Sequence, residues 1–231
     1  MVNAANRVRL IVLLCTLVNL PFLSAWGATA EQWNCGDTRV SGRQEQHDSK
    51  GQHEPAAATF TLAGLTLNKS LLTDAEAMFG PSTPASTSPR TPDARILTEC
   101  YKSAKWPGDP TVVTFITSEL TGFNELTGFQ LESDSSPEAA KCVTSSAVRS
   151  DLATGNGLRL GLSQTDMQKL LGPGSPGADG IRRWHYLGKI PVDAAEAKRT
   201  GNTYLDKYSG VNARFRNSKA DCISVFLTES Y

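Results

Sequence analysis

The sequence has little excess charge of either sign. Its 231 residues include 23 basic and 23 acidic side chains, so the formal net charge is zero. A protein that binds nucleic acid needs a basic surface to neutralise phosphates, and a near-neutral chain lacks the charge for that task. We therefore expect no nucleic-acid partner.

Signatures of metal sites are also sparse. No two of the five cysteines form a Cys-x-x-Cys pair, and the three histidines, at positions 47, 53 and 185, do not complete a zinc spacing. His47, His53 and Asp48 leave open a weak transition-metal site in a polar stretch. We expect no resident metal and no cofactor.

No catalytic motif is complete. The stretch from Gly161 to Thr165 approaches the nucleophile-elbow pattern, but Thr165 stands where a second glycine is needed. Ser163 fits the N-cap of a helix better, because its hydroxyl can accept from the first free amides. We therefore expect a non-catalytic protein. The alternative is a small secreted hydrolase using Ser163, His185 and Asp166, or a ligand-binding protein.

The N-terminus has the pattern of a secretory signal. Arg7 and Arg9 precede an apolar run from Leu10 to Trp26, and Ala28-Thr29-Ala30 offers small residues for cleavage before Glu31. A membrane anchor is the alternative, but 17 residues is short for a span of roughly 20. We expect an exported protein, periplasmic or extracellular, without a stable membrane span after cleavage.

Two stretches of the chain share an order of landmarks. Thr165-Asp166 is followed after four residues by Leu171-Gly172-Pro173, and Thr73-Asp74 is followed after four residues by Phe79-Gly80-Pro81, 92 positions earlier. Strand-like aromatic segments come after each at similar offsets. This order predicts a tandem repeat of a unit of about 90 residues.

Each unit is predicted to begin with a helix and continue with strands. Ser163 stands three residues before Asp166 as a capping signal, and Gly172-Pro173 ends the apolar stripe that follows. The earlier copy has a matching stripe: Leu71, Leu72, Ala75, Met78 and Phe79. Strands are expected at 95–101, 111–117, 126–131, 181–187, 211–215 and 222–228.

These elements predict an α+β protein with two tandem units, each a short helical segment packed on an antiparallel β-sheet. The expected domains are a cleaved signal peptide at 1–30, a polar N-terminal segment at 31–58, a first unit at 59–140 and a second at 141–231. Each helix would cover one sheet face and leave the other to water, to the second copy or to a partner.

The stretch Gly-Leu-Arg-Leu-Gly-Leu-Ser at 157–163, followed by Leu-Leu-Gly-Pro at 170–173, resembles the opening of the SmpA/OmlA outer-membrane lipoprotein family and of the related β-lactamase inhibitory proteins. The resemblance covers 157–173 and, less closely, 66–81. It implies α+β units with helices on an antiparallel sheet, which the inhibitory proteins carry twice. The chain lacks the lipoproteins' lipidation cysteine and matches no inhibitory contact residue, so no functional residue is carried over.

Four cysteines follow residue 30, and an even number in an exported chain predicts two disulfides. These are Cys35, Cys100, Cys142 and Cys222. The repeat favours one bridge within each copy, Cys35 with Cys100 and Cys142 with Cys222. A Cys100–Cys142 bridge within the first copy is the alternative.

Trp184 and Tyr186 are the candidate contact residues. At positions i and i+2 of a strand they project from the same face. Large aromatic side chains on an open sheet face often anchor a protein partner, although buried aromatics need have no such role. We expect a secreted or periplasmic interaction module that binds a protein or a cell-envelope component through exposed sheet faces.

Overall fold

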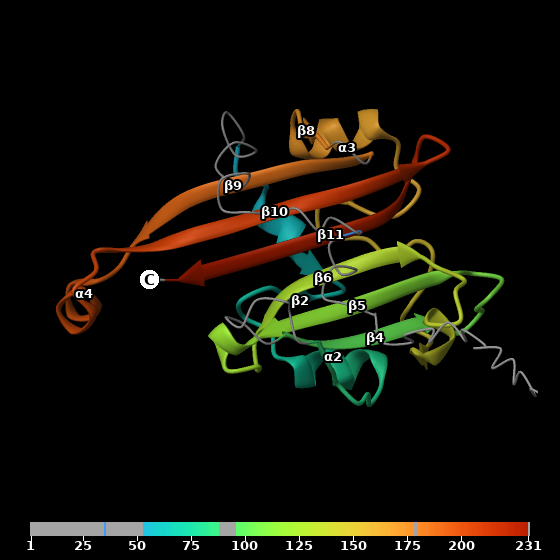
Figure 1. Ribbon diagram of the computed structural model, residues 1–231, viewed down its shortest axis with the longest axis horizontal. Coiled ribbons are helices and arrows are strands. Elements are labelled where there is room, and N and C mark those ends of the chain that lie inside the picture. Colours follow the sequence, from blue (N-terminus) through green and yellow to red (C-terminus); the bar gives the residue numbers. More distant parts are fainter. Residues whose placement is uncertain (1–34, 36–52, 88–95, 178–179, 231) are drawn as a thin grey trace, which may run out of the picture.

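Six long antiparallel strands form the centre of the structure. The computed structural model describes residue 35 and residues 53–87, 96–177 and 180–230. The sheet has nine strands in the order β3-β4-β5-β6-β11-β10-β9-β8, with β7 parallel to β4 (Figure 1). The strands are β3 (Ala85–Thr87), β4 (Ile96–Ser103), β5 (Thr111–Ser118), β6 (Leu126–Ser133), β7 (Val143–Ser145), β8 (Ser175–Pro176), β9 (Ile181–Pro191), β10 (Tyr204–Arg216) and β11 (Lys219–Ser230).

One pairing decides the fold class. β6 pairs antiparallel with β11, with Phe129 opposite Val225, so the strands of both predicted units belong to one continuous sheet. A single hydrophobic cluster includes Phe115 from one side of this junction and Trp184 from the other. The prediction of two α+β units, each with its own sheet, is therefore wrong, and the protein is mostly β. The residue types of each strand mark it locally, whereas a pairing between distant strands leaves no local signal.

Two short helices lie on one face of the sheet, which we call the core face. α2 (Leu72–Phe79) packs there with its Phe79 ring 5.1 Å from that of Phe115, and α3 (Gln164–Leu171) buries Met167 and Leu171 in the same cluster. A small separate sheet and a short helical turn add to this layer: η1 (Ala57–Phe60), β1 (Thr61–Leu62) and β2 (Leu65–Thr66). Apolar residues of the sheet, such as Val211 and Val225, face this layer.

The ends of both helices follow the sequence signals. Ser163 is the N-cap of α3, and its hydroxyl oxygen accepts from the Asp166 amide at 3.1 Å. The helix ends at Gly172, which has a φ of 81° that favours glycine. α2 ends in the same way at Gly80. The predictions of a capping serine and of glycine stops are confirmed.

The prediction that the four cysteines form disulfides is confirmed, but the favoured pairing is wrong. Cys100 is bonded to Cys142, and Cys35 is bonded to Cys222. The alternative Cys100–Cys142 bridge is therefore correct. Its cause is the parallel pairing of β7 with β4, with Val143 opposite Tyr101, because that register brings the preceding residues of the two segments together.

The remaining helical segments are short turns and one helix at the far end of the sheet: η2 (Glu119–Thr121), η3 (Ala139–Lys141) and α4 (Ala194–Thr200). Within the ranges described above, no helix is long and apolar enough to cross a membrane. The predicted signal peptide at 1–30 lies outside those ranges, as does most of the polar segment at 31–58.

Candidate functional site

The two predicted contact residues, Trp184 and Tyr186, differ in how deeply they are buried. Trp184 is only 1% exposed, and its indole donates to the carbonyl of Gly172 at 2.8 Å, just after α3. Gly174 completes this fit, because a Cβ there would lie 2.5 Å from the indole ring. Tyr186 is half-buried two residues further along β9, where the strand leaves the core. Trp184 thus holds α3 on the sheet, and Tyr186 is the more accessible of the pair.

The alternative hydrolase residues do not assemble. Ser163 caps α3 on the core face and donates its hydroxyl hydrogen to Asp166 at 2.7 Å. His185 follows Trp184 in β9 and so projects from the opposite face of the sheet. There its Nε2 lies 2.7 Å from the side-chain oxygen of Asn212, and its Nδ1 lies 3.1 Å from the Tyr208 hydroxyl. A sheet therefore stands between the serine and the histidine.

Three strands run on beyond the core. β11 pairs with β6 only from Cys222 to Phe226, whereas its later residues continue beside β10 and β9. Figure 1 shows β9, β10 and β11 reaching past the end of β6 toward α4. We call residues 186–191, 204–209 and 227–230, together with α4, the extension.

The extension has an open strand edge. The last strand beside β9 is β8, which is two residues long and pairs only with Arg182 and Arg183. Residues 186–191 of β9 pair with β10 on one side and with no described strand on the other. Unpaired amide and carbonyl groups along such an edge can bond to another strand. At the opposite edge of the sheet, β3 and β7 cover most of β4.

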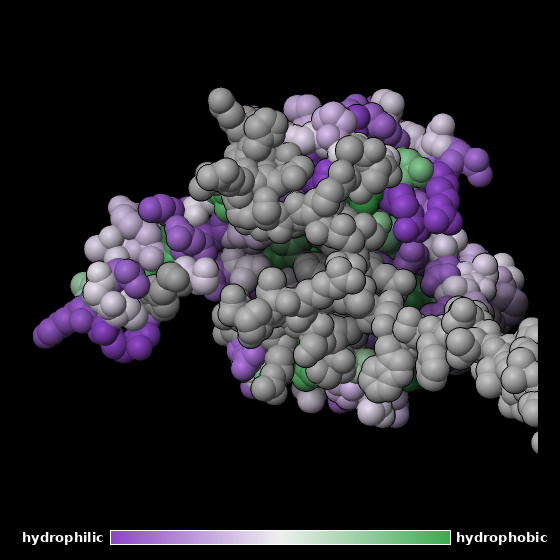
Figure 2. All heavy atoms as spheres, viewed as in Figure 1, coloured by the Kyte–Doolittle hydropathy of each residue, from purple (hydrophilic) through white to green (hydrophobic). Residues whose placement is uncertain are grey.

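Exposed apolar and aromatic side chains accompany this edge. Leu187 is 38% exposed and Tyr204 is 51% exposed, on one face of the extension. Lys189 lies over the Tyr204 ring on that face, 6.0 Å from its centre. α4 contributes no buried residue, and Figure 2 shows that the surface around it is mainly hydrophilic. The extension therefore adds little to the core and presents a mixed surface to its surroundings.

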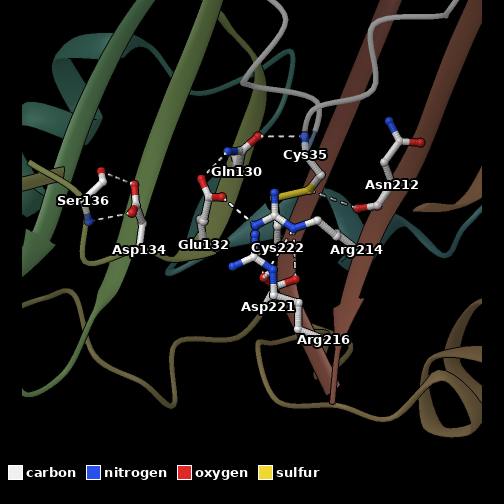
Figure 3. Close-up of polar contacts among 10 residues, drawn as sticks. All are labelled: Cys35, Gln130, Glu132, Asp134, Ser136, Asn212, Arg214, Arg216, Asp221 and Cys222. Carbon is white, nitrogen blue, oxygen red and sulfur yellow. Dashed lines mark hydrogen bonds and ion pairs between the residues drawn. A yellow bond between two sulfur atoms is a disulfide. The ribbon is translucent and has the colours of Figure 1, made fainter. Parts of the chain in front are cut away.

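A charged cluster lies on the same face of the sheet as Leu187 and Tyr204, opposite the core face, where β6, β11 and β10 meet (Figure 3). Arg214 donates to Glu132 at 2.8 Å and to Asp221 at 3.1 Å, and Arg216 lies 3.0 Å from Asp221. The register shifts after Arg214, so that Asp221 is an extra residue in β11. Such a bulge turns a side chain out of the regular alternation, which brings Asp221 to Arg214.

Burial shapes the protonation of this cluster. Burial raises the pKa of the Glu132 carboxyl, although the hydrogen bond from Arg214 opposes the rise. Burial acts against the charge of Arg214, but hydrogen bonds to Asp221 and Glu132 outweigh it and raise the pKa of the guanidinium. The disulfide Cys35–Cys222 lies beside these groups, and the Cys35 amide donates to Gln130 at 3.2 Å. The cluster thus ties β6, β10 and β11 together at the sheet's central seam.

Of the three residues in the metal site left open by the sequence, one is among the residues that the structure describes. No group of three His, Cys, Asp or Glu side chains with the geometry to hold an ion occurs among them. His53 is exposed, while His47 and Asp48 lie outside the described ranges.

Sequence reasoning missed the open edge and the charged cluster. The open edge could have been suggested by apolar residues outside the predicted strand bounds. Ile190 follows the predicted strand end at 187, and Leu205 precedes the predicted strand start at 211. The cluster had no comparable signal, since its residues meet only through the pairing of β6 with β11.

Comparison with known proteins adds no assignment: no family model, no curated protein and no solved structure matches the chain. The resemblance to SmpA/OmlA lipoproteins and β-lactamase inhibitory proteins therefore stays a prediction.

Proposed function

We propose that the protein is an exported, non-catalytic interaction module whose extension binds a partner protein by adding a partner strand to the open edge of β9. In this mode, main-chain hydrogen bonds provide the affinity, and side chains that alternate along the edge provide the selectivity. The edge carries Leu187 and Lys189 on one face and Tyr186 on the other.

The proposal rests on the contrast between the length of β9 and β10 and the small contribution of their outer residues to the hydrophobic core. β9 and β10 are 11 and 13 residues long, but their distal residues add little to the core. A seven-residue helix such as α4 is marginal without tertiary packing, yet it is held by an Asp193 cap and a Glu196–Arg199 ion pair. A role in recognition accounts for both features.

The two disulfides support the exported location, because such bonds persist mainly in oxidising compartments. The signal pattern at 1–30 supports it independently. The disulfide Cys35–Cys222 also joins the start of the expected mature chain to the strand that extends beside β10.

Site-specific photo-crosslinking tests the proposal. Benzoylphenylalanine is placed at Leu187 or Tyr204 in cells that make the protein from its own gene, and adducts are detected after irradiation. Met78 on α2, which is 42% exposed, is the matched control. We expect a discrete protein adduct from both extension positions and none from Met78.

A second measurement tests the mode of binding with the captured partner. Hydrogen exchange of the amides at 186–190 should slow in the complex, because strand addition protects them. Absence of an extension adduct, or the same adduct from Met78, would contradict the proposal. Unchanged exchange at 186–190 in the complex would contradict strand addition.

A further inference from the structure

A cavity of about 350 Å³ lies beside α2, far along the sheet from the extension. Its lining side chains come from the first half of α2, from β4 and from two connecting segments, and most are apolar: Leu71, Leu72, Pro84, Leu97 and Phe123. Two carboxylates, Glu76 and Glu99, interrupt this lining. The volume is at the lower end of the range for ligand sites, roughly 300–1,000 Å³, and therefore suits a small molecule.

Glu99 occupies a position that the strand pattern reserves for apolar residues. It alternates with Leu97 and Tyr101 on β4, and it is only 1% exposed. The Tyr101 hydroxyl donates to one of its carboxylate oxygens at 2.8 Å. The other oxygen, Oε1, is buried without a hydrogen-bond partner. An ionised carboxylate oxygen at this buried position is costly unless a proton or a bound cation satisfies it.

The neighbouring charge increases the cost. Burial raises the pKa of Glu99, and Glu76 raises it further through its like charge and through a hydrogen bond to the protonated form. The Glu99 carboxylate in turn helps burial to raise the pKa of Tyr101. No basic side chain is among the described residues that line the cavity. Among the described lining residues, the pair therefore offers negative charge and acceptor oxygens without a cationic side chain beside them.

We propose that this cavity binds a small organic cation, a primary amine on an apolar body, with its ammonium group between Glu76 and Glu99. An ammonium group has three donors, which suit the free Oε1 of Glu99 and the carboxylate of Glu76. The apolar walls would enclose the body of the ligand. A bare divalent ion fits less well, because calcium takes six to eight oxygen ligands and the cavity offers few besides these two carboxylates.

Binding of an ammonium group requires ionised Glu99, so binding and proton release are linked. The amine displaces the proton that the raised pKa of Glu99 retains. Affinity should therefore rise with pH above the ordinary glutamate value of 4.5, by up to about tenfold per unit, and level off once Glu99 is ionised in the free protein.

Benzylamine is a suitable probe, with benzyl alcohol as its uncharged counterpart. Titrations of the disulfide-bonded protein followed by calorimetry and NMR should show saturable binding of benzylamine. We expect Glu99→Gln to weaken benzylamine binding at least tenfold and to leave benzyl alcohol binding unchanged. Glu138→Gln, an exposed glutamate on the opposite side of β4, is the matched control and should change neither.

Glu76→Gln provides a second test at a less buried position on α2, and keeps the proposal falsifiable if Glu99→Gln fails to fold. It should weaken benzylamine binding and reduce its pH dependence. The proposal is overturned if the unaltered protein binds benzylamine no more tightly than benzyl alcohol up to saturation. Equal affinity of both glutamine variants and the unaltered protein for benzylamine would overturn it as well.

Discussion

The outer strands at the two ends of the sheet differ in how much of their length is paired with a neighbouring strand. At one end, β4 is covered along most of its outer side by β3 and β7, and a disulfide joins Cys100 of β4 to Cys142 just before β7. At the other end, β8 pairs with two residues of β9, and β9 continues well beyond them with no other described strand on that side. Closed edges protect a sheet from unwanted pairing. Among the described strands, the outer side of β9 is therefore unpaired from residue 186 onward, whereas most of β4 is paired on both sides.

The largest expected difference concerns the two disulfides. Cys35 and Cys222 are 187 positions apart, and Cys100 and Cys142 are 42 apart. In the chain-entropy model, replacing each pair by serine lowers the free energy of unfolding by about 5 and about 4 kcal/mol, respectively. Urea unfolding of the two double variants measures this. A larger loss for the short bridge would show that the closed end depends on its covalent link more than loop length predicts.

A second prediction compares the core with the extension. Phe115 is fully buried against Phe79 and Tyr101, so Phe115→Ala should lower the free energy of unfolding by about 3–5 kcal/mol. Tyr204→Ala in the extension should change it by no more than about 0.5 kcal/mol. Denaturant midpoints of the two variants provide the comparison. A comparable loss at Tyr204 would mean that the extension is part of the folded core.

The caps of the two main helices differ as well. Ser163→Ala removes the hydroxyl that accepts from the Asp166 amide, and should cost about 1 kcal/mol. Leu71 holds the equivalent place before α2; its amide donates to the Asp74 side chain at 2.7 Å, but its own side chain cannot accept a hydrogen bond. Leu71→Ser should therefore stabilise the protein, by up to about 1 kcal/mol. Thermal unfolding resolves both changes, and a loss with Leu71→Ser would show that packing of the leucine outweighs the missing cap.

The smallest expected effect is a change of slope with pH. Burial raises the pKa of Glu99 in the folded protein above its ordinary pKa of 4.5, so the folded state holds this proton more tightly than the unfolded state does. The resulting stabilisation is complete below that value and is lost as the pH rises through the folded pKa. Glu99→Gln should therefore flatten the fall in unfolding free energy above pH 4.5. Parallel curves for both proteins would show that Glu99 ionises as readily when folded.

Local features of the fold could be predicted, and long-range ones could not. Runs of β-branched and aromatic residues such as those of 111–118 marked the strands, and Ser163 and Gly172 marked the ends of α3. The meeting of Phe129 with Val225 had no such mark, because it depends on which distant strands pair. The error in the disulfide pairing has the same origin.

The candidate sites illustrate the same limit. Aromatic character singled out Trp184 and Tyr186 together, but only the packing of α3 separates a buried anchor from a half-buried neighbour. Glu99 did carry a signal, since an acidic residue stands between apolar residues at a core-facing position of β4. The role of this acidic residue depends on its proximity to Glu76, which lies on α2.

The position of β11 has a consequence for the order in which the chain can assemble. Among the described strands, β11 alone lies between the β3–β6 portion and the β10–β9 hairpin, and it follows both in the chain. During synthesis the two portions can form early, but they have no shared backbone ladder until β11 emerges from the ribosome. The same strand carries Cys222, the partner of Cys35, so the native bridge of Cys35 can form only after this last strand is available.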